Sequence, residues 1–242
     1  GIYLTGIVNI NKPKGKSSHF VVAVIRRITG IKKVGHTGTL DPLATGVLPI
    51  CIGRESTKLS QMIMDGTKGY IASVCLGKAT NTQDAEGEVV KEAPFSHVTK
   101  EMLLSVLSDF VGEIEQIPPM YSAIKINGQK LYNLARKGVE VERKPRKVEI
   151  YDISLLEENL KEGTFKIMVH CSKGTYIRTL CEDLGVALNS CAYMESLISC
   201  KCGRFSLDSA ITLEEFEELW KSGKADTVML SPADVLKETP LA

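Results

Sequence analysis

The chain has 242 residues, of which 43% are hydrophobic and 24% are charged, and its formal net charge is +1. This length and composition are typical of a globular protein with a substantial core, in one large domain or two small ones. They exclude a chain that crosses a membrane, because no apolar run approaches the required length, and the first residues do not resemble a secretory signal.

The cysteine pattern favours a reducing compartment. The seven cysteines are an odd number and lack the CxxC pairs of zinc ribbons and thioredoxin-like redox sites. Cys200 and Cys202 are the one close pair, and on a strand their sulfurs would share a face. We expect reduced structural thiols, no metal site and a cytoplasmic protein.

The predicted elements of the first half of the chain begin with a helix. Ser17 or Ser18 caps this helix, its apolar residues recur at helical spacing, and Gly30 closes it. In chain order the next elements are a strand at 47–52, a helix at 58–64, a strand at 70–76 and a polar turn at 80–84.

In the second half, Thr99 caps a helix that we expect to stop near Gly112. The later elements alternate irregularly, so the fold class is α+β or mixed α/β and not a repeat array. In chain order they are a strand at 121–126, a tight turn at Asn127-Gly128, a short helix at 131–137, a strand at 165–171, a helix from Thr175 to about Gly185 with Tyr176 and Arg178 in its first turn, and a helix from the Thr212 and Glu215 capping box through Trp220.

Charge is distributed unevenly along the chain. Residues 125–147 contain eight Lys or Arg against two Glu, a net of +6, whereas residues 208–226 contain six acids against two Lys, a net of −4. A polyanion would be attracted to the first region and repelled from the second. Such runs are often only solvated faces. The density of basic residues at 143–147 favours nucleic acid.

Residues 35–48 form a glycine- and threonine-rich loop that contains a single acid, Asp41. Loops fixed by a rigid scaffold often carry chemistry. Gly35, Gly38 and Gly46 allow unusual backbone shapes, and Pro42 biases Asp41 towards an extended conformation. The alternative is a turn in which Asp41 only bonds nearby amides. The whole string favours a catalytic carboxylate.

Four motifs in order resemble one family. Residues 35–48 resemble the catalytic signature of the TruB family of tRNA pseudouridine-55 synthases, and residues 12–18 resemble its amino-terminal KPxGxSS element. Residues 68–70 and 173–178 resemble its later motifs. The resemblance implies an α+β fold with a mixed, largely antiparallel central sheet flanked by helices. Residues 1–230 would then form the catalytic domain.

The resemblance also implies roles in the conversion of uridine to pseudouridine, which needs an ionised carboxylate beside the ribose and neither a cofactor nor a metal. Asp41 supplies the carboxylate, and Arg178 keeps it charged in a buried ion pair, although a phosphate contact is the alternative for this arginine. Tyr70 stacks on the flipped base, and Tyr176 relays the last proton or forms an apolar wall of the site.

Four further residues are substrate-binding candidates on the same basis. His36 resembles the histidine that enters the T-loop where bases have left, and Leu197 corresponds to an apolar residue of the pocket. Lys12 and Asp84 are candidates for supporting contacts. Core packing is the alternative for Leu197, and an Asx turn is the alternative for Asp84. In addition, Leu197 is followed by Ile198 and Ser199, where many members carry arginine, so one or two backbone contacts are in doubt.

Residues 121–150 correspond to a thumb-like insertion that closes over RNA in the family, and we expect this insertion to be mobile without ligand. Six of its cations are candidates for contacts to the RNA backbone: Lys125, Lys130, Arg143, Lys144, Arg146 and Lys147. Many bacterial members continue into a carboxy-terminal PUA domain. We expect residues 231–242 to be the start of a missing PUA region.

The function implied is isomerisation of uridine 55 in the T-loop of tRNA by a monomer that recognises the shape of the T-arm stem-loop. An RNA-binding or tRNA-folding module with secondary catalysis is the alternative. A carboxylate-based glycosidase would ordinarily need a second acid, which the motifs lack. The sequence leaves open whether Asp41 is a nucleophile at C1′, a Michael donor to the ring or a base at C2′.

Overall fold

The computed structural model describes residues 5–122, 125–126 and 128–237. They form two compact units. The first unit contains the described residues up to Tyr70 and those from Ile198 onward, and the second contains Ile71–Leu197. Along the described part of the chain, every helix is too short or too polar to cross a bilayer.

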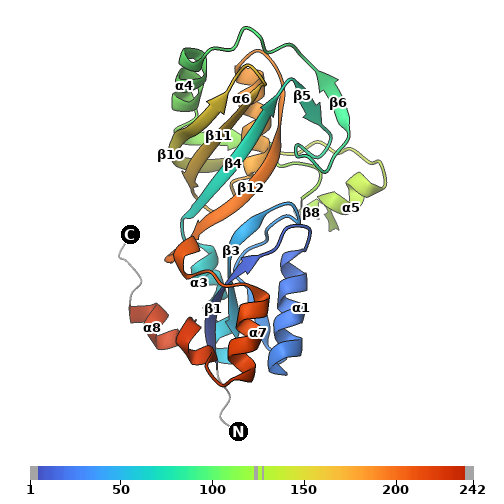
Figure 1. Ribbon diagram of the computed structural model, residues 1–242. Coiled ribbons are helices and arrows are strands. Elements are labelled where there is room, and N and C mark those ends of the chain that lie inside the picture. Colours follow the sequence, from blue (N-terminus) through green and yellow to red (C-terminus); the bar gives the residue numbers. More distant parts are fainter. Residues whose placement is uncertain (1–4, 123–124, 127, 238–242) are drawn as a thin grey trace. The chain divides into compact units, whose positions relative to one another are not determined.

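The first unit is built on strands in the order β14-β1-β3-β12 (Figure 1). One edge of β3 pairs with β1 over its whole length, and the other edge is shared by β12, which pairs at Thr45 and Gly46, and β2, which pairs from Ile50 to Ile52. The β3–β12 pair is parallel and the other pairs are antiparallel. The strands are β1 (Gly6–Lys12), β2 (Val34–His36), β3 (Thr45–Ile52), β12 (Ala192–Cys202), β13 (Phe205–Ser206) and β14 (Met229–Leu230).

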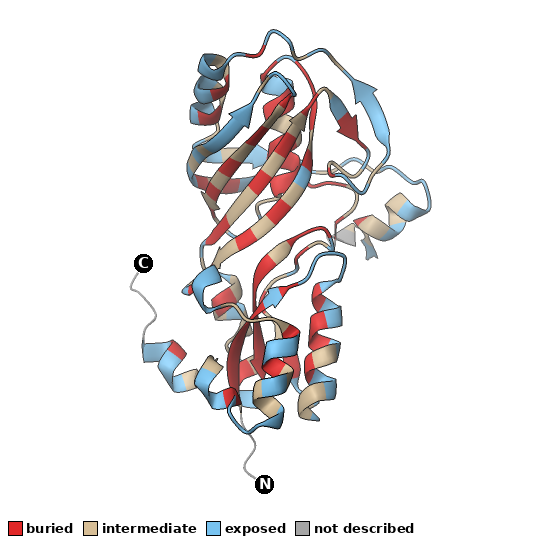
Figure 2. Ribbon diagram, viewed as in Figure 1, coloured by how far each residue is buried: buried red, intermediate tan, exposed pale blue. Residues whose placement is uncertain are grey.

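Figure 2 shows β1 and β3 buried along almost their whole lengths. Two amphipathic helices of the same unit, α1 (Ser18–Thr29) and α7 (Leu213–Lys221), contact each other beside these strands. Both begin where the sequence predicts. The Ser17 hydroxyl accepts from the Phe20 amide, and the Thr212 hydroxyl accepts from the Glu215 amide. Gly30 closes α1 at a φ of 70°, so the predicted stop is also confirmed.

The predicted helix at 58–64 is confirmed as α3 (Ser60–Met64), which begins two residues later than predicted. A short helix that was not predicted, α2 (Arg54–Thr57), precedes it. The Leu59 amide donates to the Ser56 carbonyl at 3.0 Å, which tightens the chain into a 3₁₀ turn between the two helices. The last helix of the unit is α8 (Pro232–Lys237).

The second unit contains strands in the order β12-β4-β11-β10-β7. The β10–β11 and β10–β7 pairs are antiparallel, and buried and half-buried residues alternate along β11, as Figure 2 shows. Two hairpins, β5–β6 and β8–β9, stand apart from this order. The strands are β4 (Lys68–Leu76), β5 (Lys78–Thr80), β6 (Val89–Glu92), β7 (Gly112–Gln116), β8 (Lys125–Ile126), β9 (Gln129–Lys130), β10 (Arg146–Asn159) and β11 (Thr164–Cys171).

Three helices belong to the second unit: α4 (Lys100–Asp109), α5 (Leu131–Arg136) and α6 (Ile177–Ala187). Thr99 caps α4 as predicted, but the helix ends at Asp109 because Gly112 already begins β7. Helix α6 begins two residues later than predicted, so Tyr176 is its N-cap and only Arg178 lies in its first turn.

The predicted strand at 121–126 is found only at Lys125–Ile126, since Tyr121 and Ser122 form a bend and residues 123–124 lie outside the described residues. Asn127 of the predicted turn lies outside them too. Within the predicted insertion, Arg146–Ile150 pair with β7, so these five residues belong to a sheet. The predicted fold class, an α+β fold with a mixed, largely antiparallel sheet flanked by helices, is confirmed.

Gly46 permits the close pairing of β3 with β12. Its φ is +102°, and a Cβ there would overlap the Ser199 carbonyl oxygen. We predict that Gly46→Ala lowers the free energy of unfolding by about 3 kcal/mol or more, because backbone strain and a steric clash add. Gly112→Ala is the matched control, since Gly112 has a φ of +108° and open space around it. Equal losses of stability in urea unfolding would contradict the close approach.

Candidate functional site

Asp41 lies in a loop between β2 and β3 that several elements hold in place. The Ala44 amide donates to the Asp41 carbonyl at 2.9 Å, which closes a turn with Pro42 at its second position. The Leu40 amide donates to the Ser18 hydroxyl of α1 at 2.8 Å. Asp41 itself is half-buried. The loop therefore presents its one carboxylate from a fixed backbone.

Lys12 joins this loop to the amino-terminal motif. Its side chain is fully buried, and its ammonium group donates to the carbonyls of Pro13 at 2.7 Å, of Lys16, and of Pro42 at 3.3 Å. Burial lowers the pKa of Lys12 to about 8, against the opposing effect of the Asp41 charge. The two groups are therefore close enough for their charges to interact. The predicted substrate contact of Lys12 stays a prediction.

His36 lies at the end of β2 and is half-buried. The Gly38 amide donates to Nδ1 at 3.3 Å, so the proton of a neutral ring is on Nε2. Burial, followed by the neighbouring His19, lowers the pKa of His36. A neutral imidazole with one N–H donor suits contact with nucleobases better than proton transfer.

Tyr70 is the last residue of the first unit and is half-buried in β4. Lys68, two residues before it, is buried and donates to the carbonyls of Met64 at 2.8 Å and Gly66 at 3.0 Å. This second buried lysine fixes the turn from α3 into β4. The sequence shows the lysine in a motif but gives no sign of this anchoring role.

Arg178 belongs to the second unit and is 6% exposed. Its Nη1 donates to the Thr82 carbonyl at 3.2 Å, and its Nη2 donates to the Tyr121 carbonyl at 2.8 Å. The guanidinium group is therefore oriented by two loops at the start of α6.

The loop at 81–87 is bound to α6 through Gln83. Its carboxamide oxygen accepts from the Thr179 hydroxyl at 2.8 Å, and its nitrogen donates to the Glu182 carboxylate at 3.1 Å. Asp84 is buried, and its carboxylate accepts from the Thr82 hydroxyl at 2.7 Å and the Glu86 amide at 3.0 Å. These bonds within its own loop form the Asx turn that the sequence offered as the alternative to a substrate contact. A substrate contact by Asp84 stays a prediction.

Tyr176 is held by a residue that the sequence analysis missed. The Gln116 carboxamide, at the end of β7 and buried, accepts from the Tyr176 amide at 2.9 Å and donates to the Tyr176 carbonyl at 3.1 Å. Both backbone groups of the helix N-cap are thus satisfied by one side chain. No local pattern signals this contact, because the two residues are 60 positions apart.

The remaining candidates also lie in the second unit. Leu197 is buried in β12. Lys130 donates to the Tyr132 hydroxyl at 3.3 Å, and Lys147 lies 3.5 Å from Glu113. Arg143 is half-buried, Lys144 and Arg146 are exposed, and the side chain of Lys125 lies outside the described residues.

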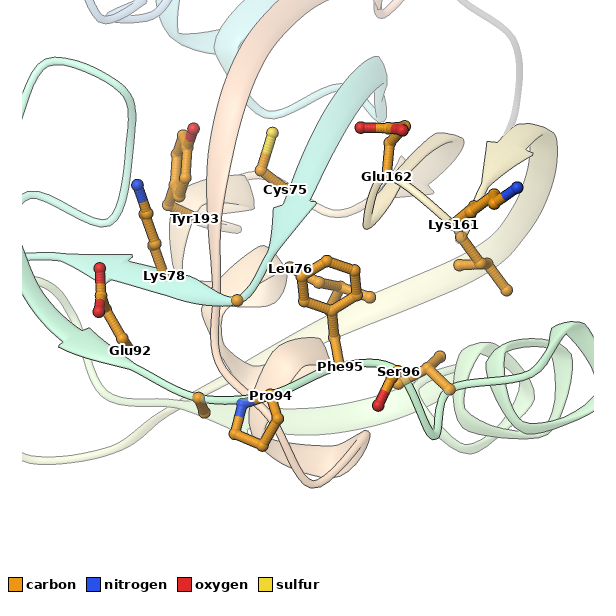
Figure 3. Close-up of a pocket in the computed structure, with 14 residues that line it drawn as sticks. Cys75, Leu76, Lys78, Glu92, Pro94, Phe95, Ser96, Lys161, Glu162 and Tyr193 are labelled. Atoms are coloured by element: carbon orange, nitrogen blue, oxygen red, sulfur yellow. The ribbon is translucent and has the colours of Figure 1, made fainter.

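One concavity in the second unit has a volume of about 1080 Å³ (Figure 3). Oppositely charged side chains such as Lys78 and Glu92 line it, and none of the described residues around it is a predicted site residue. Its Cys75 thiol donates to the Glu195 carboxylate at 2.9 Å. Burial and this bond raise the pKa of Cys75 to about 11, so the thiol stays protonated at neutral pH and is a poor nucleophile.

The structure therefore brings the candidates together in two sets. The first unit carries Lys12, His36, Asp41 and Tyr70, and the second carries Asp84, Tyr176, Arg178, Leu197 and the basic insertion. The ion pair between Asp41 and Arg178 stays a prediction.

Family models match almost the whole chain. Residues 26–177 match the model described as TruB family pseudouridylate synthase (N terminal domain), and residues 178–237 match the model described as tRNA pseudouridylate synthase B C-terminal domain. The tRNA pseudouridine synthase B of Clostridium tetani is 53% identical over 215 residues, which cover 89% of this chain and 73% of the relative. That of Syntrophotalea carbinolica is 45% identical over 237 residues, which cover 98% and 76%.

Solved structures are similar as well. A chain of a Cbf5-Nop10-Gar1 complex gives a TM-score of 0.75 at 28% identity, and a chain of an H/ACA RNP bound to a substrate RNA containing 2′-deoxyuridine gives 0.71 at 26%. Both similarities cover 96% of this chain, which spans only 61% of the length of either solved chain.

The buried Lys12 predicts a pH-dependent stability. Its pKa is about 8 in the folded state and 10.5 ordinarily, so between these values the folded state binds fewer protons than the unfolded state. The free energy of unfolding then rises with pH, by up to about 1.4 kcal/mol per pH unit. The Lys12→Met variant has no titratable group at this position. We expect the stability advantage of the wild type over Lys12→Met to widen from pH 8 to pH 10.5 in urea unfolding. A constant difference would contradict the assignment, and exposed Lys14→Met is the control.

Proposed function

The chain belongs to the TruB family of pseudouridylate synthases, and on this premise we propose that it isomerises uridine to pseudouridine in tRNA, at position 55 of the T-loop. The observation that carries the proposal is Asp41, a single carboxylate on a loop fixed by α1, by its own turn and by the buried Lys12 ammonium. An acid held in this way suits chemistry at a sugar more than a surface contact.

The reaction breaks the bond between N1 and C1′, turns the detached uracil and joins C5 to C1′. The proposal assigns the essential negative charge to Asp41, whether it acts at C1′, at the ring or on the proton at C2′. Each route needs the carboxylate to be ionised. Two cations support this state: Lys12, whose charge interacts with Asp41, and Arg178, which we propose as its ion-pair partner.

The same proposal gives roles to the residues around the base. Tyr70 stacks on the flipped uracil, because stacking tolerates rotation of the ring. Tyr176, whose backbone Gln116 holds, lies against the ring and relays the proton lost from C5. Leu197 forms an apolar wall, and Lys12 and Asp84 support the loops that meet the substrate.

For the partner, we propose the T-arm stem-loop, recognised by a monomer mainly through shape and backbone contacts. The exposed cations Lys144 and Arg146 of the basic insertion support an RNA partner, since phosphate contacts come chiefly from such side chains. An RNA-binding or tRNA-folding module would account for these cations. It would leave the fixed acid of the signature loop without a role.

Asp41→Asn tests the enzymatic assignment. We expect the rate of pseudouridine formation in a T-arm stem-loop to fall on the order of 10³-fold or more, because the amide keeps the shape but loses the charge. The exposed Asp208→Asn in the same unit is the matched control. Equal rates for wild type and Asp41→Asn would end this assignment.

Arg178→Gln tests the ion pair in the same assay. Loss of the guanidinium group raises the pKa of a neighbouring carboxylate. The acid limb of the pH profile of kcat/KM should therefore move to higher pH. An unchanged acid limb with lower activity would instead indicate that Arg178 contacts phosphate or only supports the loops at Thr82 and Tyr121.

His36→Ala tests the proposed binding role of the neutral histidine. Because His36 would fill the space left by flipped bases, its loss should weaken binding of the stem-loop by about 10-fold or more and leave single-turnover rates at saturating RNA nearly unchanged. Stem-loop affinity and single-turnover rate measure the two effects separately. Loss of turnover at unchanged affinity would contradict a binding role.

A further inference from the structure

The amino-terminal segment before Asp41 carries only positive charge. Residues 5–40 contain seven Lys or Arg and no Asp or Glu. Three of the seven have structural partners. Lys12 is buried, Arg26 donates to the carbonyls of Lys32 and Val34, and Arg27 pairs with Glu217 at 3.7 Å. The other four, Lys14, Lys16, Lys32 and Lys33, are exposed.

Two of the exposed cations, Lys14 and Lys16, are fixed beside the signature loop. The Gly15 amide between them donates to the Pro42 carbonyl at 2.7 Å, and the Lys16 carbonyl accepts from the buried Lys12 ammonium. Within residues 14–16 these bonds use backbone groups only, and both lysine side chains are exposed. The backbone that carries these two side chains is hydrogen-bonded to Pro42, the residue after Asp41.

An exposed aromatic ring lies next to these lysines. Phe20, in the first turn of α1, is 38% exposed, and the Lys16 ammonium is 4.9 Å from the centre of its ring. His19 precedes it, is exposed, and is near enough to His36 to lower the pKa of that ring. Cations interleaved with aromatic rings are the usual composition of sites for single-stranded nucleic acid.

Among the described residues, acidic side chains do not neutralise the surface around Lys14 and Lys16. Within residues 5–122, 125–126 and 128–237, no carboxylate is within ion-pair distance of Lys14 or Lys16. Most exposed lysines gain little from an ion pair, so this alone would mean nothing. Here the two unpaired lysines belong to the same unit as Asp41, and so do the exposed Phe20 ring and His36. All of them lie along the edge of the Asp41 loop.

We propose that Lys14, Lys16, His19 and Phe20 form a second RNA-contact surface, on the first unit, that holds the unpaired nucleotides flanking the target uridine. This inference rests on the proposed function and extends it. The lysines neutralise two phosphates of the flanking strand, and the Phe20 ring stacks on a base next to the everted one. The surface differs from the basic insertion, which belongs to the second unit.

Position argues for RNA over the other polyanions that cations attract. A nucleotide whose sugar reaches Asp41 must bring its neighbouring phosphates to the adjacent backbone, where Lys14 and Lys16 stand. An acidic protein or an anionic lipid headgroup would satisfy the lysines but would not need a half-exposed aromatic ring beside a carboxylate. Such a ligand would also be repelled by Asp41 without compensation.

The test compares two double variants of equal charge. Lys14→Gln with Lys16→Gln should weaken binding of a T-arm stem-loop about 10-fold at roughly 0.1 M salt, and should lower the slope of log Kd against log salt by about 1.4, the value for two phosphates of a single strand. Lys100→Gln with Lys161→Gln, both exposed in the second unit, is the matched control and should change neither value.

Phe20→Leu separates stacking from charge. It should weaken binding about 5-fold or more at any salt concentration and leave the slope unchanged, because leucine keeps the apolar character but lacks the π face. Thermal unfolding of each variant checks that the fold is intact. A Lys14→Glu with Lys16→Glu variant should give a larger loss than the glutamine pair.

Unchanged affinity and slope in the lysine pair would overturn the inference, and so would an equal loss in the control pair, which would indicate a general effect of net charge. The proposed function is tested separately by pseudouridine formation in the wild type. Wild-type activity together with unaffected lysine variants would refute only the second surface. Weakened binding in these variants without wild-type activity would support the surface and refute the enzyme.

Discussion

The buried ammonium group of Lys12 holds the amino-terminal motif against the loop that carries Asp41. It donates to carbonyls from two segments about 30 residues apart, the amino-terminal motif and the loop that carries Asp41. Burying a cation is costly unless it is paired and hydrogen-bonded, so its position is retained only while these acceptors and the Asp41 charge surround it. The geometry of the Asp41 loop and the charge beside its carboxylate therefore both depend on the placement of Lys12.

The second unit fixes its candidate residues in the same manner. Arg178 donates to two loop carbonyls, and the carboxamide of Gln116 binds both backbone groups of Tyr176. Gln83 ties a further loop to α6. Arg178 and Gln116 are buried and satisfy backbone groups, whereas Gln83 bonds two side chains of α6. These bonds hold the loops at 81–87 and around Tyr121 and Tyr176 against α6.

Local sequence rules predicted the features that local contacts control. The caps at Ser17, Thr99 and Thr212 are confirmed, because a hydroxyl and an amide three residues apart decide them. The long strands β10 and β12 were not predicted. Most residues of β10 are exposed or half-buried and so show no apolar alternation, and β12 changes partners along its length. The helix predicted at 58–64 begins only at Ser60, because a 3₁₀ turn at Leu59 precedes it.

By itself the sequence determined the order of the motifs, the single acid of the signature loop, the fold class and the family, since these depend on residue identity and spacing along the chain. Only the tertiary structure decided that Lys12 bonds three carbonyls, that Asp84 accepts from its own loop and that Gln116 holds Tyr176. The physical reason is that a buried polar group must find its partner where the fold places one. Several partners lie near Lys12 and Asp84 in the sequence and packing selects among them, whereas Gln116 and Tyr176 are 60 positions apart and leave no mark of their pairing in a linear pattern.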